Sequence, residues 1–414
     1  MLDEPRSAKL LYLHIGLHKT GTTYLQHVMR ANRDALAEQD VFFPGGEQVG
    51  QMLAVWDLFG RRPRGAQDGR INGQWAALAQ LVNGDETPVA LVSEEYLSLA
   101  TVAQARRAVA SFPGTEVHVV VTARDIGRVA VSAWQEEVKN DKTWTWDEFA
   151  AAIRDPGARA RNPARGFWLR QDLPAILETW RAAVPAERIH VVTVPPPGAD
   201  PAELLGRFAQ LVGFDHTRLP HEPKWNNQTL GIAGTEVVRR LNERLDHRLN
   251  QRQHDRVVKL TLVPAMGRRL GSSRFGLPPD QVDWAQSWSH EALTQIDKAG
   301  YQVVGDLTDL VPVRQAGVRR PDDASTEELL EAAMTALGEL AERHARAWWD
   351  KKQPDVGVEG SSRRTRMASA ARGAVFRGQR RAAEVADRNA AVGRLMGRFL
   401  AARATARRRA ARSD

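Results

Sequence analysis

The sequence contains no cysteine among its 414 residues. This absence excludes disulfide bonds, thiolate metal sites and a cysteine nucleophile. The chain also lacks a run of the roughly eighteen apolar residues that a membrane-spanning helix needs. Its apolar run after Lys9 is short and is interrupted by histidines, unlike the core of a signal peptide. We therefore expect a cytoplasmic protein. Because the histidines do not gather at ligand spacing, we predict no metal site.

Positive charge is concentrated at the C-terminal end. The net charge is +8, but residues 360–414 hold fifteen arginines against only Glu384, Asp387 and Asp414. The first 359 residues therefore carry a small net negative charge, which does not favour a nucleic-acid-binding face on the folded body. We expect the tail to be a flexible or partly helical extension, with contact to an anionic membrane or another polyanion as the alternative.

Apolar runs and helical patterns alternate along the first half of the chain. Four apolar runs predict buried strands, at residues 10–15, 89–92, 117–122 and 188–194. Apolar periodicity between and after them predicts helices, at residues 22–37, 102–111, 127–139, 174–183 and 201–212. This alternation is typical of an α/β fold in which a parallel sheet is covered by helices on both faces, giving three layers.

The second half of the chain reads as helical from about residue 230, with no further strand. A Gly/Pro-rich stretch at 271–280 interrupts the helices, and residues 326–349 form an Ala/Leu/Glu-rich helix. We therefore predict a domain over 1–320, with a nucleotide-binding core at about 10–230 and a helical part at 230–320. A C-terminal helix over 321–352 and a basic Ala/Arg-rich tail over 353–414, beginning with a polar linker, complete the chain.

A polar, glycine-containing loop separates the first predicted strand from the first helix. It reads Gly16-Leu17-His18-Lys19-Thr20-Gly21-Thr22-Thr23. Main-chain N–H groups at a helix start attract anions, and glycine lets the backbone approach a phosphate closely. Lysine adds a mobile positive charge, and the threonines add hydroxyl donors. The loop therefore predicts an anion site.

The residue order differs from that of a nucleoside-triphosphate loop. In such a loop the lysine directly follows the second glycine and a Ser/Thr holds magnesium, whereas Lys19 precedes Gly21 by two residues. An ATPase also needs an acidic residue for Mg²⁺, and the third strand ends in Thr-Ala-Arg-Asp. A small-molecule kinase with a variant loop remains the alternative enzyme.

The segment LHKTGTTYLQ resembles the sulfotransferase superfamily, whose loop reads Lys-x-Gly-Thr-Thr after a first strand. The resemblance implies a sulfotransferase fold of the P-loop NTPase-like type and 3′-phosphoadenosine 5′-phosphosulfate (PAPS) as co-substrate, without a metal. It implies that the 5′-phosphosulfate contacts Lys19, Thr20, Gly21, Thr22 and Thr23. It also implies that Lys19 stabilises charge on the bridging oxygen as the sulfuryl group leaves.

A second element of the resemblance follows the third strand. Family members place an arginine at the end of this strand and a serine eight residues later, and both contact the 3′-phosphate; Arg124 and Ser132 match this spacing. A guanidinium group also suits phosphate oxygens on physical grounds. Arg128 adds charge nearby without a motif match. The resemblance covers about residues 10–230 and looks closest to bacterial members with Ser-x-Trp-Gln, as in 132–135. The family's later basic-glycine motif is not recognisable, and segment 224–229 is its candidate replacement.

The acceptor must lose a proton during sulfuryl transfer, which calls for a base. Glu94 and Glu95 follow the second strand, and because strand residues alternate faces we expect only one to point inward. Similar family branches use a glutamate within Ser-x-Glu, which favours Glu95 in Ser93-Glu94-Glu95. His18 on the loop is a rival, whereas His14 within a strand reads as a core histidine. The base therefore stays open among three residues.

Twelve tryptophans are present, and Trp144 and Trp146 follow the second nucleotide element. They fit either an aromatic acceptor pocket or core packing, and packing is favoured for at least one of them. The sequence as a whole predicts a sulfotransferase acting on a hydroxyl or amine of an acceptor such as a carbohydrate or small metabolite. Besides the kinase, a non-catalytic nucleotide-binding module recruited by its basic tail is the remaining reading.

Overall fold

The computed structural model describes residues 8–45, 50–61, 70–200, 202–221, 230–269, 275–315 and 317–351. The chain divides into two compact units, Met1–Ala336 and Leu337–Asp414. The segment 224–229 and the predicted tail over 353–414 lie outside the described residues, so the roles suggested for them stay predictions. The predicted domain limits also stay predictions.

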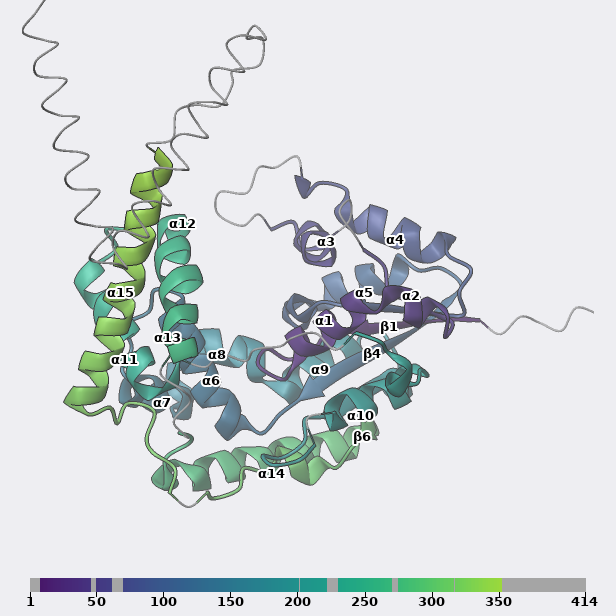
Figure 1. Cartoon of the computed structure of the whole chain (residues 1–414). Coiled ribbons are helices and arrows are strands. Elements are labelled where there is room, and N and C mark those ends of the chain that lie inside the picture. Colours follow the sequence, from purple (N-terminus) through teal and green to yellow (C-terminus); the bar gives the residue numbers. More distant parts are fainter. Residues whose placement is uncertain are drawn as a thin grey trace, which may run out of the picture. The chain divides into compact units, whose positions relative to one another are not determined.

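Six parallel strands form one sheet at the centre of the first unit (Figure 1). In spatial order they are β2 (Val41–Phe42), β3 (Val89–Ser93), β1 (Lys9–His14), β4 (Thr115–Ala123), β5 (Ile189–Thr193) and β6 (Gln302–Val304). Every neighbouring pair is parallel. The first strand lies between the third and the fourth, so the loops that leave these three strands meet at one edge of the sheet. A ligand in an open α/β sheet binds at such an edge, where the strand order reverses.

Helices cover both faces of this sheet. One face packs on α3 (Gln51–Leu58), α4 (Gln74–Gly84), α5 (Val102–Ala110), α9 (Leu173–Arg181) and α14 (Val282–Ala299). The other face packs on α1 (Thr22–Ala31), α2 (Arg33–Ala37) and α10 (Glu203–Val212). Along β1, Leu11 and Leu13 join the first core and Tyr12 joins the second, because alternate strand residues point to opposite faces. The predicted three-layer α/β class is confirmed.

A separate helical core lies beside the sheet. Its side chains come mostly from α6 (Ile126–Lys139), α7 (Trp146–Arg154), α8 (Ala164–Gln171), α11 (Gly231–Leu245), α13 (Val263–Arg269), the start of α14 and the first part of α15 (Thr326–Lys351). Trp134, Trp146 and Phe149 are fully buried at its centre. The short helix α12 (Gln251–His254) follows α11 in the chain. Between α12 and α13 the chain forms a π-helix, Asp255–Leu262. Such segments are rare and are often found at functional sites. This core places α6 and the π-helix beside the loop after β1.

Two sequence predictions differ from the structure. The helix predicted over 22–37 is two helices, because the chain breaks at Asn32, whose side chain bonds to the main chain of His221 in both directions, at 2.8 and 2.9 Å. Strands also do not stop at residue 230, since β6 extends the sheet beside β5. This strand has only three residues and two of them are exposed, so it carries no buried apolar run for the sequence to reveal.

Candidate functional site

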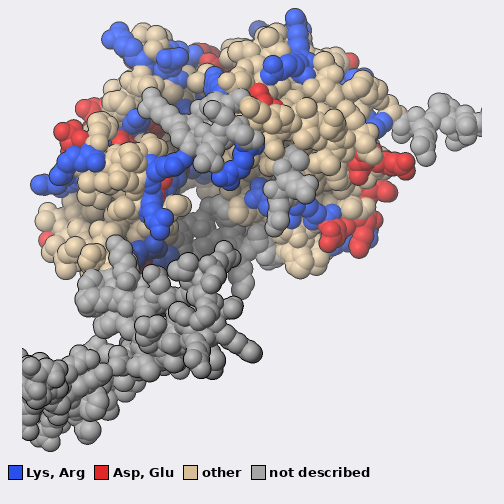
Figure 2. All heavy atoms as spheres, turned by 90° about the horizontal axis from the view of Figure 1, so that it is seen from above, with Lys and Arg blue, Asp and Glu red and all other residues tan. Residues whose placement is uncertain are grey.

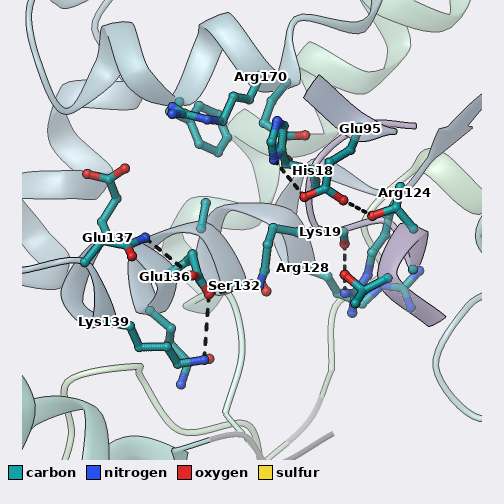
Figure 3. A pocket seen from close by; sticks show the side chains of 18 of the residues that line it. His18, Lys19, Glu95, Arg124, Arg128, Ser132, Glu136, Glu137, Lys139 and Arg170 are labelled. Carbon is teal, nitrogen blue, oxygen red and sulfur yellow. Dashed lines mark hydrogen bonds and ion pairs between the residues drawn. The ribbon is translucent and has the colours of Figure 1, made fainter. Parts of the chain in front are cut away.

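A cavity of about 900 Å³ opens at the carboxyl edge of the sheet. Its wall is formed by the loop after β1, by Glu95 after β3, by Arg124 after β4 and by one face of α6, with further residues from α8 and the π-helix. Figure 3 shows side chains from these elements facing one another around it. Figure 2 shows several lysine and arginine side chains around a hollow in the face drawn there. The sheet topology therefore brings together residues that lie far apart in the sequence.

The loop after β1 turns sharply through three residues with positive φ: Gly16 at 45°, Lys19 at 69° and Gly21 at 87°. A β-carbon on Gly16 would lie 2.2 Å from the Thr22 methyl carbon, and one on Gly21 would lie 2.6 Å from Leu204. Both positions therefore require glycine. A non-glycine residue in the left-handed region costs on the order of 1 kcal/mol or more. Lys19 is held there at this cost, and its side chain points into the cavity.

The threonines of the loop serve different purposes. Thr22 and Thr23 begin α1 and line the cavity, where the first N–H groups of the helix have no partner within the helix. Thr20 is completely buried, and its hydroxyl donates to the carbonyl of Leu17 at 2.6 Å. The Thr20 side chain thus stabilises the turn from beneath, and only its main chain remains available to a bound anion.

Arg124 lies beside this loop at the end of β4. Its Nη1 donates to the carbonyl oxygen of Lys19 over 3.5 Å, and its Nε is buried without a hydrogen-bond partner in the described structure. Burial and the charge of Arg128 lower the pKa of Arg124 to about 10, with Asp125 opposing them. A buried cation with an unused donor is destabilised unless an anion accompanies it. The position therefore fits a phosphate group.

One face of α6 continues the site away from Arg124. Arg128, Ser132 and Glu136 recur at four-residue spacing and all line the cavity. Arg128 forms an ion pair with Asp125 and donates to the carbonyl of Pro195 at 3.1 Å. Arg124, Arg128 and Ser132 thus line the same cavity, and a shared role for Arg124 and Ser132 stays a prediction.

A second cavity of about 1150 Å³ adjoins the first and shares Arg124, Arg128, Ser132 and Gln135 with it. Much of its remaining wall is apolar: Pro196, Pro197, Phe275, Leu277, Val282, Val311, Pro312, Val313 and Val318. Flat apolar walls beside clustered cations suit a ligand that joins an aromatic ring to an anion. This cavity could not be predicted from the sequence, because most of its apolar lining comes from loops without a recognisable pattern.

The two candidate glutamates lie in different environments. Glu95 lines the cavity, accepts a hydrogen bond from the Thr22 hydroxyl and lies 3.4 Å from Nδ1 of His18. Burial acts to raise the pKa of Glu95, but His18, the Thr22 hydroxyl and Lys19 outweigh it and hold that pKa below its ordinary value. Glu95 is thus a carboxylate near neutral pH, able to accept a proton.

Glu94 is buried and is not among the residues that line the cavity, and its carboxyl accepts from the N–H of Tyr96 at 3.4 Å. Burial and the charge of Glu95 raise the pKa of Glu94 to about 7. His18 lines the cavity, and its Nε2 is buried without a hydrogen-bond partner in the described structure. Of the three candidate bases, Glu95 and His18 therefore reach the cavity and Glu94 does not.

Three lysine ammonium groups lie around the carboxylate of Glu136, beside the loop after β1. Its carboxylate lies 3.4 Å from Lys19 Nζ, 2.9 Å from Lys259 Nζ and 3.9 Å from Lys139 Nζ. Sequence reasoning had singled out Lys19 but missed Glu136, Lys139 and Lys259. Lys139 could have been found, because it lies seven residues after Ser132 on the same face of α6. Lys259 comes from the π-helix, which has no sequence signature.

The tryptophans belong mostly to the core. Trp146 is fully buried against Trp134 and Phe149, and Trp144 packs against the same cluster. Trp134 donates from Nε1 to the carbonyl of Trp144 at 2.9 Å. Neither Trp144 nor Trp146 lines the cavity, whose aromatic wall is instead Tyr24, Tyr96, Phe149 and Phe167.

Within the described ranges, the side chains of His, Asp and Glu form no group of three or more able to hold a metal ion. None of the helices described there is long and apolar enough to cross a membrane.

Comparison with known proteins gave structural matches. No family model and no curated protein matches the sequence. A crystal structure of a sulfotransferase from Alicyclobacillus acidocaldarius is similar over 60% of this chain and 99% of its own, with 17% identity and a TM-score of 0.35. The sulfotransferase domain from the curacin biosynthetic pathway is similar over 72% of this chain and 99% of its own, with 13% identity and a TM-score of 0.30. Both structures are of sulfotransferases.

Proposed function

We propose that this protein transfers a sulfuryl group from PAPS to a hydroxyl or amine of an acceptor, and that it acts in the cytoplasm. One observation carries the proposal: Lys19 and Arg124 converge on one cavity, with Arg124 Nη1 3.5 Å from the Lys19 carbonyl oxygen. The sequence resemblance assigns these residues to the two anionic ends of a single nucleotide. Their convergence supports that assignment.

The nucleotide would bind along the loop and α6. Its 5′-phosphosulfate would meet Lys19, Gly21, Thr22, Thr23 and the main chain of Thr20 at the start of α1, where helix N–H groups favour an anion. Its 3′-phosphate would meet Arg124, Ser132 and Arg128. The adjoining apolar cavity, which begins at these residues, is large enough for the adenine ring.

The chemistry then requires a proton acceptor and a group that stabilises the leaving phosphate. The acceptor oxygen or nitrogen attacks sulfur, a new bond to sulfur forms, and the bond from sulfur to the bridging phosphate oxygen breaks. Glu95 takes the acceptor proton, and Lys19 stabilises the negative charge that develops on the bridging oxygen. Adenosine 3′,5′-bisphosphate leaves with that electron pair. His18, beside Glu95, orients the carboxylate.

The remaining wall of the cavity would receive the acceptor. It presents the ring of Tyr96 and the guanidinium of Arg170, which are both partly exposed, while Phe149, Phe167 and Gln171 on the same wall are buried. Aromatic faces with neighbouring hydrogen-bonding groups suit a carbohydrate or a similar polar metabolite. This composition supports a polar acceptor without naming it.

Calorimetry with adenosine 3′,5′-bisphosphate tests the proposal most directly, followed by an acceptor screen with labelled PAPS. We expect binding without added metal and undiminished by EDTA. If the protein binds ATP only with Mg²⁺ and ignores the bisphosphate, a kinase is the better description. If it binds neither nucleotide, the sulfotransferase proposal fails.

A further inference from the structure

The convergence of Lys19, Lys139 and Lys259 on Glu136 has no place in the transfer chemistry described above. The three ammonium groups come from the loop after β1, from α6 and from the π-helix. Asn140 completes the group by donating to Glu136 at 3.3 Å and accepting from Lys259 at 2.7 Å. A carboxylate of the protein thus lies among the cations, beside the loop where an external anion would bind.

The carboxyl group of Glu136 is ionised at neutral pH and in moderately acidic solution. Burial acts to raise the pKa of Glu136, but Lys19, Lys139 and Lys259 lower it to about 2. Its partner Lys19 is the residue whose charge the phosphosulfate needs. An anion that approaches Lys19 must therefore share it with Glu136 or separate the two, and it also meets the repulsion of that fixed negative charge.

We propose that Glu136 is an internal competitor for Lys19, one that keeps simple inorganic anions off the phosphate loop. The inference rests on the proposed function. An inorganic sulfate at the loop is held by the loop and its lysine alone, and Glu136 offsets part of that attraction. A bisphosphate nucleotide meets the same competition but also binds Arg124 and Ser132 at its other end, so it still occupies the site. Glu136 is a positioning residue in this account, because it acts through Lys19.

The test compares Glu136→Gln with Glu137→Gln, its neighbour on α6, which lines the same cavity. Calorimetry measures the affinity of each protein for adenosine 3′,5′-bisphosphate and, in separate direct titrations, its affinity for inorganic sulfate. Since one partly exposed charge pair is removed, we expect Glu136→Gln to bind both ligands about five- to tenfold more tightly. Glu137→Gln should shift either affinity by about twofold or less.

A double-mutant cycle shows whether the effect passes through Lys19. In a Lys19→Ala background, the gain from Glu136→Gln should shrink to about twofold or less, since the shared partner is missing. An equal gain in that background would mean that Glu136 acts through the general charge of the site, which contradicts the proposal. Unchanged or weaker binding by Glu136→Gln contradicts it as well.

Two further measurements keep the outcomes separate. If Glu136→Gln does not fold, Glu136→Asp keeps the charge but shortens the reach to Lys19, and we expect a smaller gain of the same sign. If the wild-type protein does not bind the bisphosphate, the proposed function fails. The sulfate affinities of the wild type and the variants still decide the role of Glu136 in that case.

Discussion

The guanidinium of Arg124 donates to the main-chain carbonyl of Lys19 over 3.5 Å, although 105 positions separate the two residues in the sequence. This contact exists because β1 and β4 are neighbours in the sheet and end at the same edge. The two side chains come from different elements. Both side chains line the cavity, Lys19 from the loop and Arg124 from the end of β4, where its Nε has no partner in the described structure.

The first prediction separates these roles by substitution. Lys19→Ala should lower kcat by about 10²- to 10³-fold, because it removes a positive charge at the bond that breaks. Arg124→Ala should weaken the affinity for adenosine 3′,5′-bisphosphate by about 10- to 100-fold, the usual worth of charge-assisted hydrogen bonds. Steady-state kinetics with labelled PAPS and calorimetry with the bisphosphate measure the two effects. Near-normal turnover by Lys19→Ala would show that the role given to Lys19 is wrong.

The second prediction concerns the base. Glu95→Gln should lower kcat by about 10²- to 10⁴-fold while the protein still binds the bisphosphate, since proton transfer to Glu95 is lost. Glu94→Gln is the matched control, because it changes the adjacent carboxyl, which does not line the cavity. We expect it to keep kcat within a small factor. The reverse result would assign the base to Glu94, and full activity in both variants would direct attention to His18.

Much of the fold follows from local pattern. The strands at the centre of the sheet are continuous apolar runs with helices between them, and the helix predicted at 127–139 is found as α6, Ile126–Lys139. Because α6 is regular, the four-residue spacing from Ser132 to Glu136 puts both side chains on one face. Central strands and amphipathic helices carry their signal in their own residues.

The missing parts depend on tertiary contacts. The break at Asn32 is set by hydrogen bonds to His221, which lies 189 residues further along the chain. The short edge strands β2 and β6 are held by their neighbours and have no buried run of their own. Lys259 reaches the site only because a π-helix turns it there, and Arg170 comes from α8, which was not predicted. In each case the residues that make contact lie too far apart in the sequence for a local pattern to connect them.

The third prediction follows from the buried carboxyl of Glu94. Its pKa is raised to about 7 in the folded protein, against about 4.5 when unfolded. Between these values the folded state holds a proton that the unfolded state has lost, so stability falls as the pH rises from 4.5 through 7. Glu94→Gln removes this dependence. At pH 8 the free energy of unfolding of Glu94→Gln should exceed that of the wild type by up to about 3 kcal/mol, and this difference should shrink toward pH 5.

Urea unfolding of the wild type and Glu94→Gln at pH 5, 6, 7 and 8 measures this effect. If the free energies of unfolding of the wild type and Glu94→Gln change in parallel over that pH range, the pKa of Glu94 is not raised. The same variant serves the kinetic comparison with Glu95, so its folding is established alongside its activity.

The fourth prediction concerns His14, which the sequence suggested as a core histidine. The residue is buried, with Nδ1 2.7 Å from the Ser93 hydroxyl and Nε2 3.2 Å from the Thr122 hydroxyl. Burial lowers its pKa to about 4, with the charge of Glu95 opposing this. The folded protein therefore keeps His14 neutral, whereas the unfolded chain takes up a proton as the pH falls below about 6.5. Stability contributed by His14 is complete above that pH, is lost on acidification and levels off below about pH 4.

Replacing His14 should remove this part of the acid sensitivity. His14→Asn retains a polar group toward Ser93, and we expect its free energy of unfolding to fall by up to about 3 kcal/mol less than that of the wild type between pH 6.5 and pH 4. His290→Asn is the control, because this histidine is exposed on α14 and its loss should leave the pH dependence as in the wild type. Urea unfolding across this range measures all three proteins. If the wild type and His14→Asn lose stability in parallel on acidification, the imidazole beneath the phosphate loop is not held neutral by its burial.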